Sequence, residues 1–139
     1  MIIRLHHIGI AVGDLAQALV LFRDALGLQL VQEIDRPGLR AALLPIGGIV
    51  LELIQPDEHP QNRPGEVLAD LVRERGGGVH HLAFEVDDIE REVSLLSRRG
   101  IFTLDDAPVP QAGRKIAWLK EDSMAGAMIE ICVKGYRIA

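Results

Sequence analysis

Short apolar runs recur along the chain, and two of them are nearly identical. The first is LHHIGIAVGDL, beginning at Leu5, and the second is VHHLAFEVDDI, beginning at Val79. Each run is rich in Ile, Val and Leu and then reaches an aspartate, a pattern typical of a strand followed by a helix N-terminus. An internal repeat of this kind predicts two copies of one structural unit.

A helix is predicted after each of these strands. Asp14 and Asp88 are placed to cap the helices, because an aspartate oxygen can accept hydrogen bonds from the first backbone N–H groups. Gly27 and Gly100 are placed to end them. Apolar residues at helical spacing form a stripe in each predicted helix: Leu15, Ala18, Leu19, Phe22 and Leu26 in the first, and Ile89, Val93 and Leu96 in the second.

Three further strand-like runs follow each predicted helix. They lie near residues 28–34, 39–46 and 48–54 in the first copy, and near 101–104, 114–119 and 127–133 in the second. A polar loop, QPDEHPQNRPG, and a predicted helix from Glu66 to Arg75 join the two copies. We therefore predict an α+β fold with tandem βαβββ modules: a single domain, 1–139, with a first module at 1–54, a linker with a helix at 55–78 and a second module at 79–139.

The two faces of each opening strand differ in character. Strand side chains alternate between faces, so the large apolar residues share the face that is predicted to pack on a helix. The other face carries His7 in the first copy and His81 in the second. His7 is followed on that face by Gly9, which leaves room beside the imidazole that helix packing does not need. His6 and His80 fall on the helix-facing side and are predicted to be packing residues.

A lone acid interrupts the last apolar run of each copy: Glu52 in IVLELI and Glu130 in MIEICV. Their separation in sequence is close to that of His7 and His81, so the two acids are also repeat-equivalent. A carboxylate inside a sheet is costly unless something compensates its charge. Two such acids, each with an equivalent histidine, predict one divalent metal ion held by His7, Glu52, His81 and Glu130. Zinc, nickel, cobalt, manganese and ferrous iron all suit imidazole and carboxylate ligands, and the sequence does not choose among them.

Composition narrows the classes of function. The chain has 139 residues, 48% apolar and 25% charged, which suits one globular domain with a core. The net charge of −5, the scattered Lys and Arg and the 4% aromatic content argue against a nucleic-acid partner. No run is long enough for a membrane span, no secretory signal is visible and Cys132 is the single cysteine. We therefore expect a cytoplasmic protein that acts on a small molecule.

The tandem unit, with His, Glu, His and Glu in that order, resembles the vicinal oxygen chelate superfamily of glyoxalases, bleomycin-resistance proteins and extradiol dioxygenases. Within it, the motifs HHIGIAVGDL, LELIQP, GGGVHHLAFEVDDIE and MIEI are most similar to the methylmalonyl-CoA epimerase family, nearly end to end. The resemblance implies paired modules whose curved mixed sheet encloses one divalent metal ion. It implies the same four ligands, His7, Glu52, His81 and Glu130, and a homodimer.

The resemblance also implies an activity. An epimerase of methylmalonyl-CoA, or of a similar 2-substituted acyl-CoA, moves the α proton through an enolate that the metal stabilises. Glu130 is the first candidate for one of the two proton-transfer residues. The family's second glutamate precedes a glycine where this chain has the shorter segment EIDRPGLR, so either the role moves to Asp35 or Glu33, or the substrate differs. Arg114 and Lys115 are predicted to contact CoA phosphates.

Four other functions are compatible with parts of this pattern. A glyoxalase-type lyase or isomerase would use the same four ligands. An extradiol dioxygenase needs two histidines and one carboxylate, and a fourth ligand at Glu52 argues against it. A non-enzymatic small-molecule-binding module or a structural domain would need no metal. In the structural case the two glutamates would only border a sheet and form ion pairs with Arg4 or Lys115.

Overall fold

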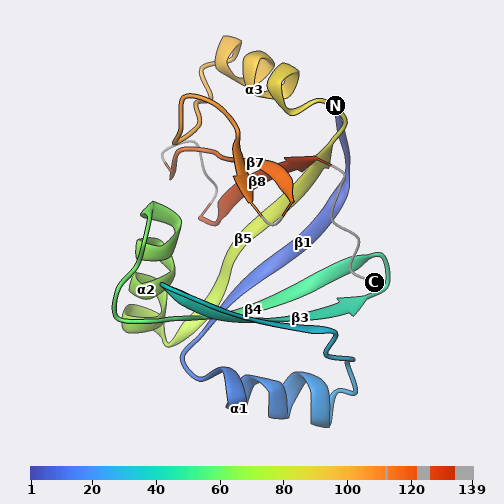
Figure 1. The fold of residues 1–139 in the computed structure, drawn as a ribbon, viewed down its shortest axis with the longest axis vertical. Coiled ribbons are helices and arrows are strands. Elements are labelled where there is room, and N and C mark those ends of the chain that lie inside the picture. Colours follow the sequence, from blue (N-terminus) through green and yellow to red (C-terminus); the bar gives the residue numbers. More distant parts are fainter. Residues whose placement is uncertain (112, 122–125, 134–139) are drawn as a thin grey trace. The chain divides into compact units, whose positions relative to one another are not determined.

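Two compact units make up the chain, and we call them by the sequence copy that dominates each. The first-repeat unit is His7–His80, and the second-repeat unit is Met1–His6 together with His81–Ala139. The computed structural model describes residues 1–111, 113–121 and 126–133. Both unit boundaries fall inside long strands, β1 (Ile2–Val12) and β5 (Gly77–Val86), which are the two repeated runs of the sequence (Figure 1).

The first-repeat unit contains a mixed sheet. Its strand β4 (Ile49–Pro56) pairs in parallel with β1 and antiparallel with β3 (Leu39–Ile46). Strand β3 in turn pairs antiparallel with β2 (Gln32–Arg36). The order along the sheet is therefore β2-β3-β4-β1.

Helices pack on both faces of this sheet. Successive strand residues point to opposite faces, and Leu53 and Ile54 of β4 belong to different core clusters. Leu53 packs with the helix α1 (Leu15–Leu19), and Ile54 packs with the helix α2 (Arg63–Arg75). The chain continues from α1 into a π-helical segment, η1 (Val20–Ala25).

The second-repeat unit repeats this order of pairing strand for strand. Strand β8 (Met128–Val133) pairs in parallel with β5 and antiparallel with β7 (Arg114–Trp118), and β7 pairs antiparallel with β6 (Val109–Gln111). The helix α3 (Ile89–Arg98) covers one face of this sheet (Figure 1). The α+β class and the tandem βαβββ modules of the vicinal oxygen chelate fold are confirmed.

The predicted helix starts are confirmed at the atomic level. The Asp14 side chain accepts a hydrogen bond from the Gln17 backbone N–H, and Asp88 accepts one from the Arg91 N–H. The stripe prediction was wrong at one position, because Leu26 is 59% exposed. The cause is the π-helical segment: an extra residue in each turn rotates Leu26 out of the stripe that the preceding apolar residues form.

Two predicted strands lie elsewhere in the structure. The run 28–34 is strand only from residue 32, because its leucines pack into the α1 cluster instead of pairing with a neighbour. The run 101–104 makes only one isolated bridge, Thr103 to Leu119, while the edge strand forms at β6. In both cases an apolar run packs against a core cluster at some of its positions without joining a strand ladder. Hydrophobic periodicity cannot distinguish such a run from a strand.

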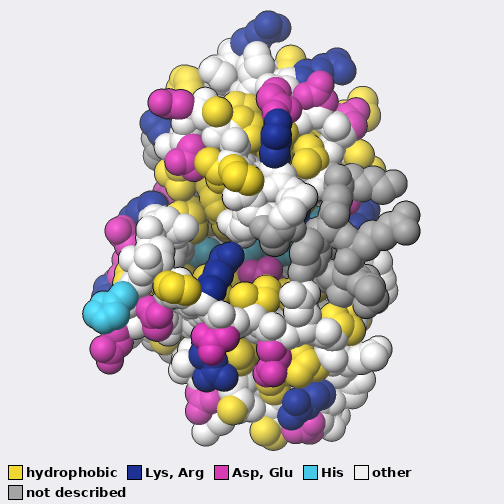
Figure 2. Space-filling model, in the orientation of Figure 1, with side chains coloured by type: hydrophobic (Ala, Val, Ile, Leu, Met, Phe, Trp, Pro, Cys, Tyr) yellow, Lys and Arg dark blue, Asp and Glu magenta, His cyan; other side chains and the backbone are white. Residues whose placement is uncertain are grey.

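The charged surface is mixed in sign. On the face drawn in Figure 2, Lys and Arg side chains lie among Asp and Glu side chains and do not gather into one patch. Among the described residues, no helix is both long enough and apolar enough to span a lipid bilayer.

Candidate metal centre

One histidine–glutamate pair lies in the first-repeat unit. His7 on β1 is only 3% exposed, and its Nε2 lies 3.8 Å from Oε2 of Glu52 on β4. In the parallel register His7 is opposite Val50 and Gly9 is opposite Glu52, so the two side chains share a face with an offset of two residues. Gly9, opposite Glu52, carries no side chain on this face.

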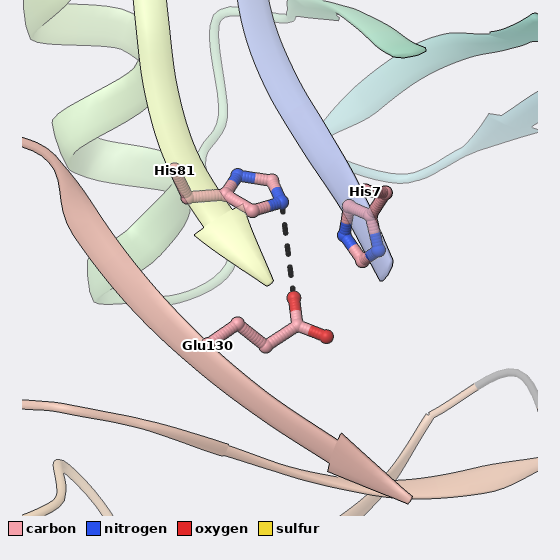
Figure 3. Close-up of side chains that lie close together, drawn as sticks. All are labelled: His7, His81 and Glu130. Atoms are coloured by element: carbon pink, nitrogen blue, oxygen red, sulfur yellow. Dashed lines mark ion pairs between the residues drawn. The ribbon is translucent and has the colours of Figure 1, made fainter. Parts of the chain in front are cut away.

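The second-repeat unit contains the equivalent pair with the same geometry. His81 Nε2 lies 3.8 Å from Glu130 Oε2, and both side chains are almost completely buried. His81 is opposite Met128 and Ala83 is opposite Glu130, so the offset is again two residues. Figure 3 shows the imidazole on β5 facing the carboxylate on β8, joined by the dashed line of this ion pair; His7, also drawn, comes from β1.

The donor atoms of each pair suit two ligands of one divalent ion. A separation of 3.8 Å exceeds the roughly 3.2 Å limit of an ordinary N–H···O hydrogen bond. Two metal–ligand bonds of about 2.1 Å each can span it. Imidazole nitrogen with carboxylate oxygen is also a donor set that first-row divalent metals accept. The residues of each pair therefore fit the predicted metal.

Arg114 contacts the other carboxylate oxygen of Glu130. Its Nη2 lies 3.4 Å from Glu130 Oε1, whereas Oε2 is the oxygen that faces His81. Its Nη1 lies 3.4 Å from both ring nitrogens of His6, so the guanidinium rests against that ring and is not aimed at a single lone pair. Trp118, which is opposite Glu130 in the β7–β8 register, meets His81 edge to face at 4.9 Å.

The two acids predicted for the second proton transfer lie on the exposed strand β2. Glu33 is opposite Ala42, whose side chain packs under α1. Asp35 shares the face of Glu33 because it is two residues further along the strand. Glu52 is opposite Leu43, the neighbour of Ala42, and so belongs to the other face. The structure therefore does not bring Asp35 or Glu33 next to Glu52.

The two basic residues predicted to contact CoA phosphates differ in exposure. Lys115 is exposed, and its Nζ lies 2.6 Å from Glu90 Oε1. This hydrogen bond raises the pKa of Lys115 and lowers that of Glu90. Arg114 is buried beside Glu130. Both residues border an open hollow of about 810 Å³, together with Asp88 and Gly113.

The other conspicuous residues are parts of the core. His80, predicted to be a packing residue, has Nε2 2.9 Å from the Pro64 carbonyl oxygen in α2. His6, also predicted to be a packing residue, is buried, and Arg114 Nη1 lies 3.4 Å from its ring nitrogens. Burial raises the pKa of the Cys132 thiol to about 12, which is typical of an unreactive, structural cysteine.

Comparison with known protein families shows the superfamily of this chain. Residues 6–118 match the model of the Glyoxalase/Bleomycin resistance protein/Dioxygenase superfamily, and the chain belongs to that superfamily.

Individual relatives narrow the class further. The mitochondrial methylmalonyl-CoA epimerase of Mus musculus is 30% identical over 131 residues, which cover 92% of this chain and 71% of the relative. A crystal structure of methylmalonyl-CoA epimerase from Mycobacterium tuberculosis superposes with a TM-score of 0.83 at 28% identity and covers 97% of this chain and 90% of that one. A variant of the Streptomyces coelicolor enzyme, in complex with 2-nitronate-propionyl-CoA, gives 0.82 at 25% identity and covers 98% and 100%. These relatives confirm the prediction of an enzyme of the racemase and epimerase type.

Proposed function

We propose that this chain is a metal-dependent epimerase of methylmalonyl-CoA or of a similar 2-substituted acyl-CoA. The observation that carries the proposal is the repeated His–Glu pair. In both units the histidine Nε2 and the glutamate Oε2 are 3.8 Å apart, at equivalent positions. The relatives supply the substrate class, because they are named for methylmalonyl-CoA or, in Cereibacter sphaeroides, for ethylmalonyl-CoA/methylmalonyl-CoA.

The proposed ligands of a single divalent ion are His7, Glu52, His81 and Glu130. Two carboxylates offset the charge of the ion, which makes the burial of Glu130 less costly. When bound, the ion supplies positive charge for two oxygens of the substrate, where negative charge grows as the α proton leaves. A cytoplasmic homodimer with one such site in each chain completes the proposal.

Glu130 is the proposed proton-transfer residue on one side of the α carbon. Its carboxylate is 1% exposed and oriented by neighbours on both oxygens, which suits a group that must remove a proton from a fixed direction. Epimerisation also needs a group on the opposite side of the carbon. The sequence candidates for that role are Asp35 and Glu33; both lie on the face of the sheet opposite to Glu52, and Asp35→Asn and Glu33→Gln test them one at a time.

Solvent deuterium exchange tests the proposed function. The protein is incubated with methylmalonyl-CoA in D₂O, with and without prior removal of metal by a chelator, and NMR follows the signal of the hydrogen on C2. We expect exchange that the chelator abolishes and added Co²⁺ restores. Exchange that survives complete metal removal would contradict the role of the metal. A metal-loaded protein that exchanges nothing but converts the hemithioacetal of glutathione and methylglyoxal would instead be a glyoxalase-type enzyme.

A further inference from the structure

The buried Arg114 has a geometry that the repeat does not explain. In the first-repeat unit, His7 and Glu52 lie at the same distance from each other. The equivalent strand there, β3, has no arginine at the matching position, so the repeat alone does not account for Arg114. In the second-repeat unit, Arg114 contacts Oε1 of Glu130, whereas His81 is near Oε2. A buried arginine is costly to place, so its position calls for a reason.

The two oxygens of Glu130 have different neighbours. Oε1 lies 3.4 Å from Arg114 Nη2, and Oε2 lies 3.8 Å from His81 Nε2. A guanidinium donates from fixed directions, and His6 rests against the other terminal nitrogen of Arg114. This arrangement holds one oxygen of the carboxylate and leaves the other directed at the histidine with which it would share an ion.

Arg114 also changes the charge of the proposed site, on which this inference rests. The charges of the two glutamates cancel the charge of a divalent ion. The guanidinium of Arg114 then gives the metal-bound site a net positive charge. A positive site holds a cation less tightly and an anion more tightly, since both interactions are coulombic in a poorly solvated pocket. The substrate class proposed above carries a carboxylate and gains a second negative charge as its α proton leaves.

We propose that Arg114 is a positioning residue that binds Glu130 by Oε1 and directs Oε2 to the metal. Its positive charge weakens the binding of the cation and strengthens the binding of an anionic acyl-CoA. The role differs from the phosphate contact expected from the sequence. It predicts two effects of opposite sign when the charge is removed, whereas a purely structural arginine would weaken both kinds of binding.

The test compares Arg114→Met with Arg114→Lys, and uses Arg4→Met as the matched control. Arg4 forms another arginine–glutamate pair in the same unit, with its Nε 3.0 Å from Oε2 of the buried Glu85. Metal-stripped proteins are titrated with Co²⁺ and followed by visible absorption. The Co²⁺-loaded proteins are then titrated with malonyl-CoA by calorimetry.

For Arg114→Met we expect Co²⁺ to bind at least tenfold more tightly and malonyl-CoA at least tenfold more weakly. Arg114→Lys keeps the charge but not the fork, so both of its constants should lie between those of the wild type and Arg114→Met. Arg4→Met should leave both unchanged. Unaltered or weaker Co²⁺ binding in Arg114→Met, or in the equally uncharged Arg114→Gln if the first variant does not fold, would overturn the inference. A wild-type protein that binds no Co²⁺ would refute the proposed function itself, which separates the two failures.

Discussion

Replacing Glu130 by glutamine removes a charge and almost nothing else. Glutamine has the same length and keeps an acceptor oxygen for Arg114, but it is a poor metal ligand and cannot take up a proton. Losing a proton-transfer group typically costs about 10²- to 10⁴-fold in rate. The weakened metal site adds to that loss, so we expect the rate of C2 exchange to fall by at least about 10³-fold, the middle of that range.

The stability of this variant should change far less. A hydrogen bond to a charged group contributes about 1.5–3 kcal/mol, and the 3.4 Å contact with Arg114 is long, which points to the lower end. Domains are typically stable by about 5–15 kcal/mol, so Glu130→Gln should remain folded.

Two measurements on the same preparation separate these effects. Exchange in D₂O gives the rate, and a thermal melt followed by circular dichroism gives the stability. Glu90→Gln is the matched control, because Glu90 is an exposed acid of the same unit and pairs only with Lys115 among the partners described above. An exchange rate equal to that of the wild type in Glu130→Gln would remove Glu130 from both proposed roles, as ligand and as proton-transfer group.

Three further predictions concern residues outside the proposed ligand set. Gly77 has φ +130°, and a Cβ there would overlap the carbonyl oxygen of Ala11. Gly77→Ala should therefore lower the free energy of unfolding, measured with urea, by about 1–3 kcal/mol. Gly48→Ala is the control, because a Cβ at Gly48 meets open space and should change that free energy little. The Cys132 thiol keeps its proton in the folded state at a pH where the unfolded chain loses it, so stability should fall as pH rises above the ordinary value of 9.0. Between pH 9 and 10 the wild type should therefore lose up to ~1.4 kcal/mol more than Cys132→Ala, and equal losses would be inconsistent with the raised pKa. Replacing His80 by glutamine should cost about 1 kcal/mol through its bond to Pro64 and leave Co²⁺ affinity unchanged; a large loss of Co²⁺ affinity would make His80 a ligand.

The repeat made much of the fold predictable from sequence. Two aspartates at equivalent positions predicted both helix starts. The period-2 alternation predicted which face of β1 and of β5 carries His7 and His81, and the register places Glu52 and Glu130 on those same faces. Glu52 and Glu130 stood out because a lone acid in an apolar strand is costly. These signals are local, and each was present twice, so one copy supported the other.

Other features depend on register and packing, which the sequence does not display. The role of Arg114 beside Glu130 follows from the β7–β8 pairing, which places Arg114, Ile116 and Trp118 on one face. Period-2 alternation puts these three residues on one face of any strand, but nothing in the sequence indicates which strand lies beside that face. The exposure of Leu26 follows from a π-helical segment, and that conformation has no simple compositional signal.

The number of divalent ions bound by each chain tests the central claim most directly. Metal-stripped protein is titrated with Co²⁺ to saturation, for the wild type and for His7→Gln and His81→Gln. If the two His–Glu pairs hold one ion together, the wild type binds one ion per chain, and either substitution weakens that single binding event to a similar extent. Two ions per chain, with each substitution removing only one of them, or no bound ion at all, would contradict the account.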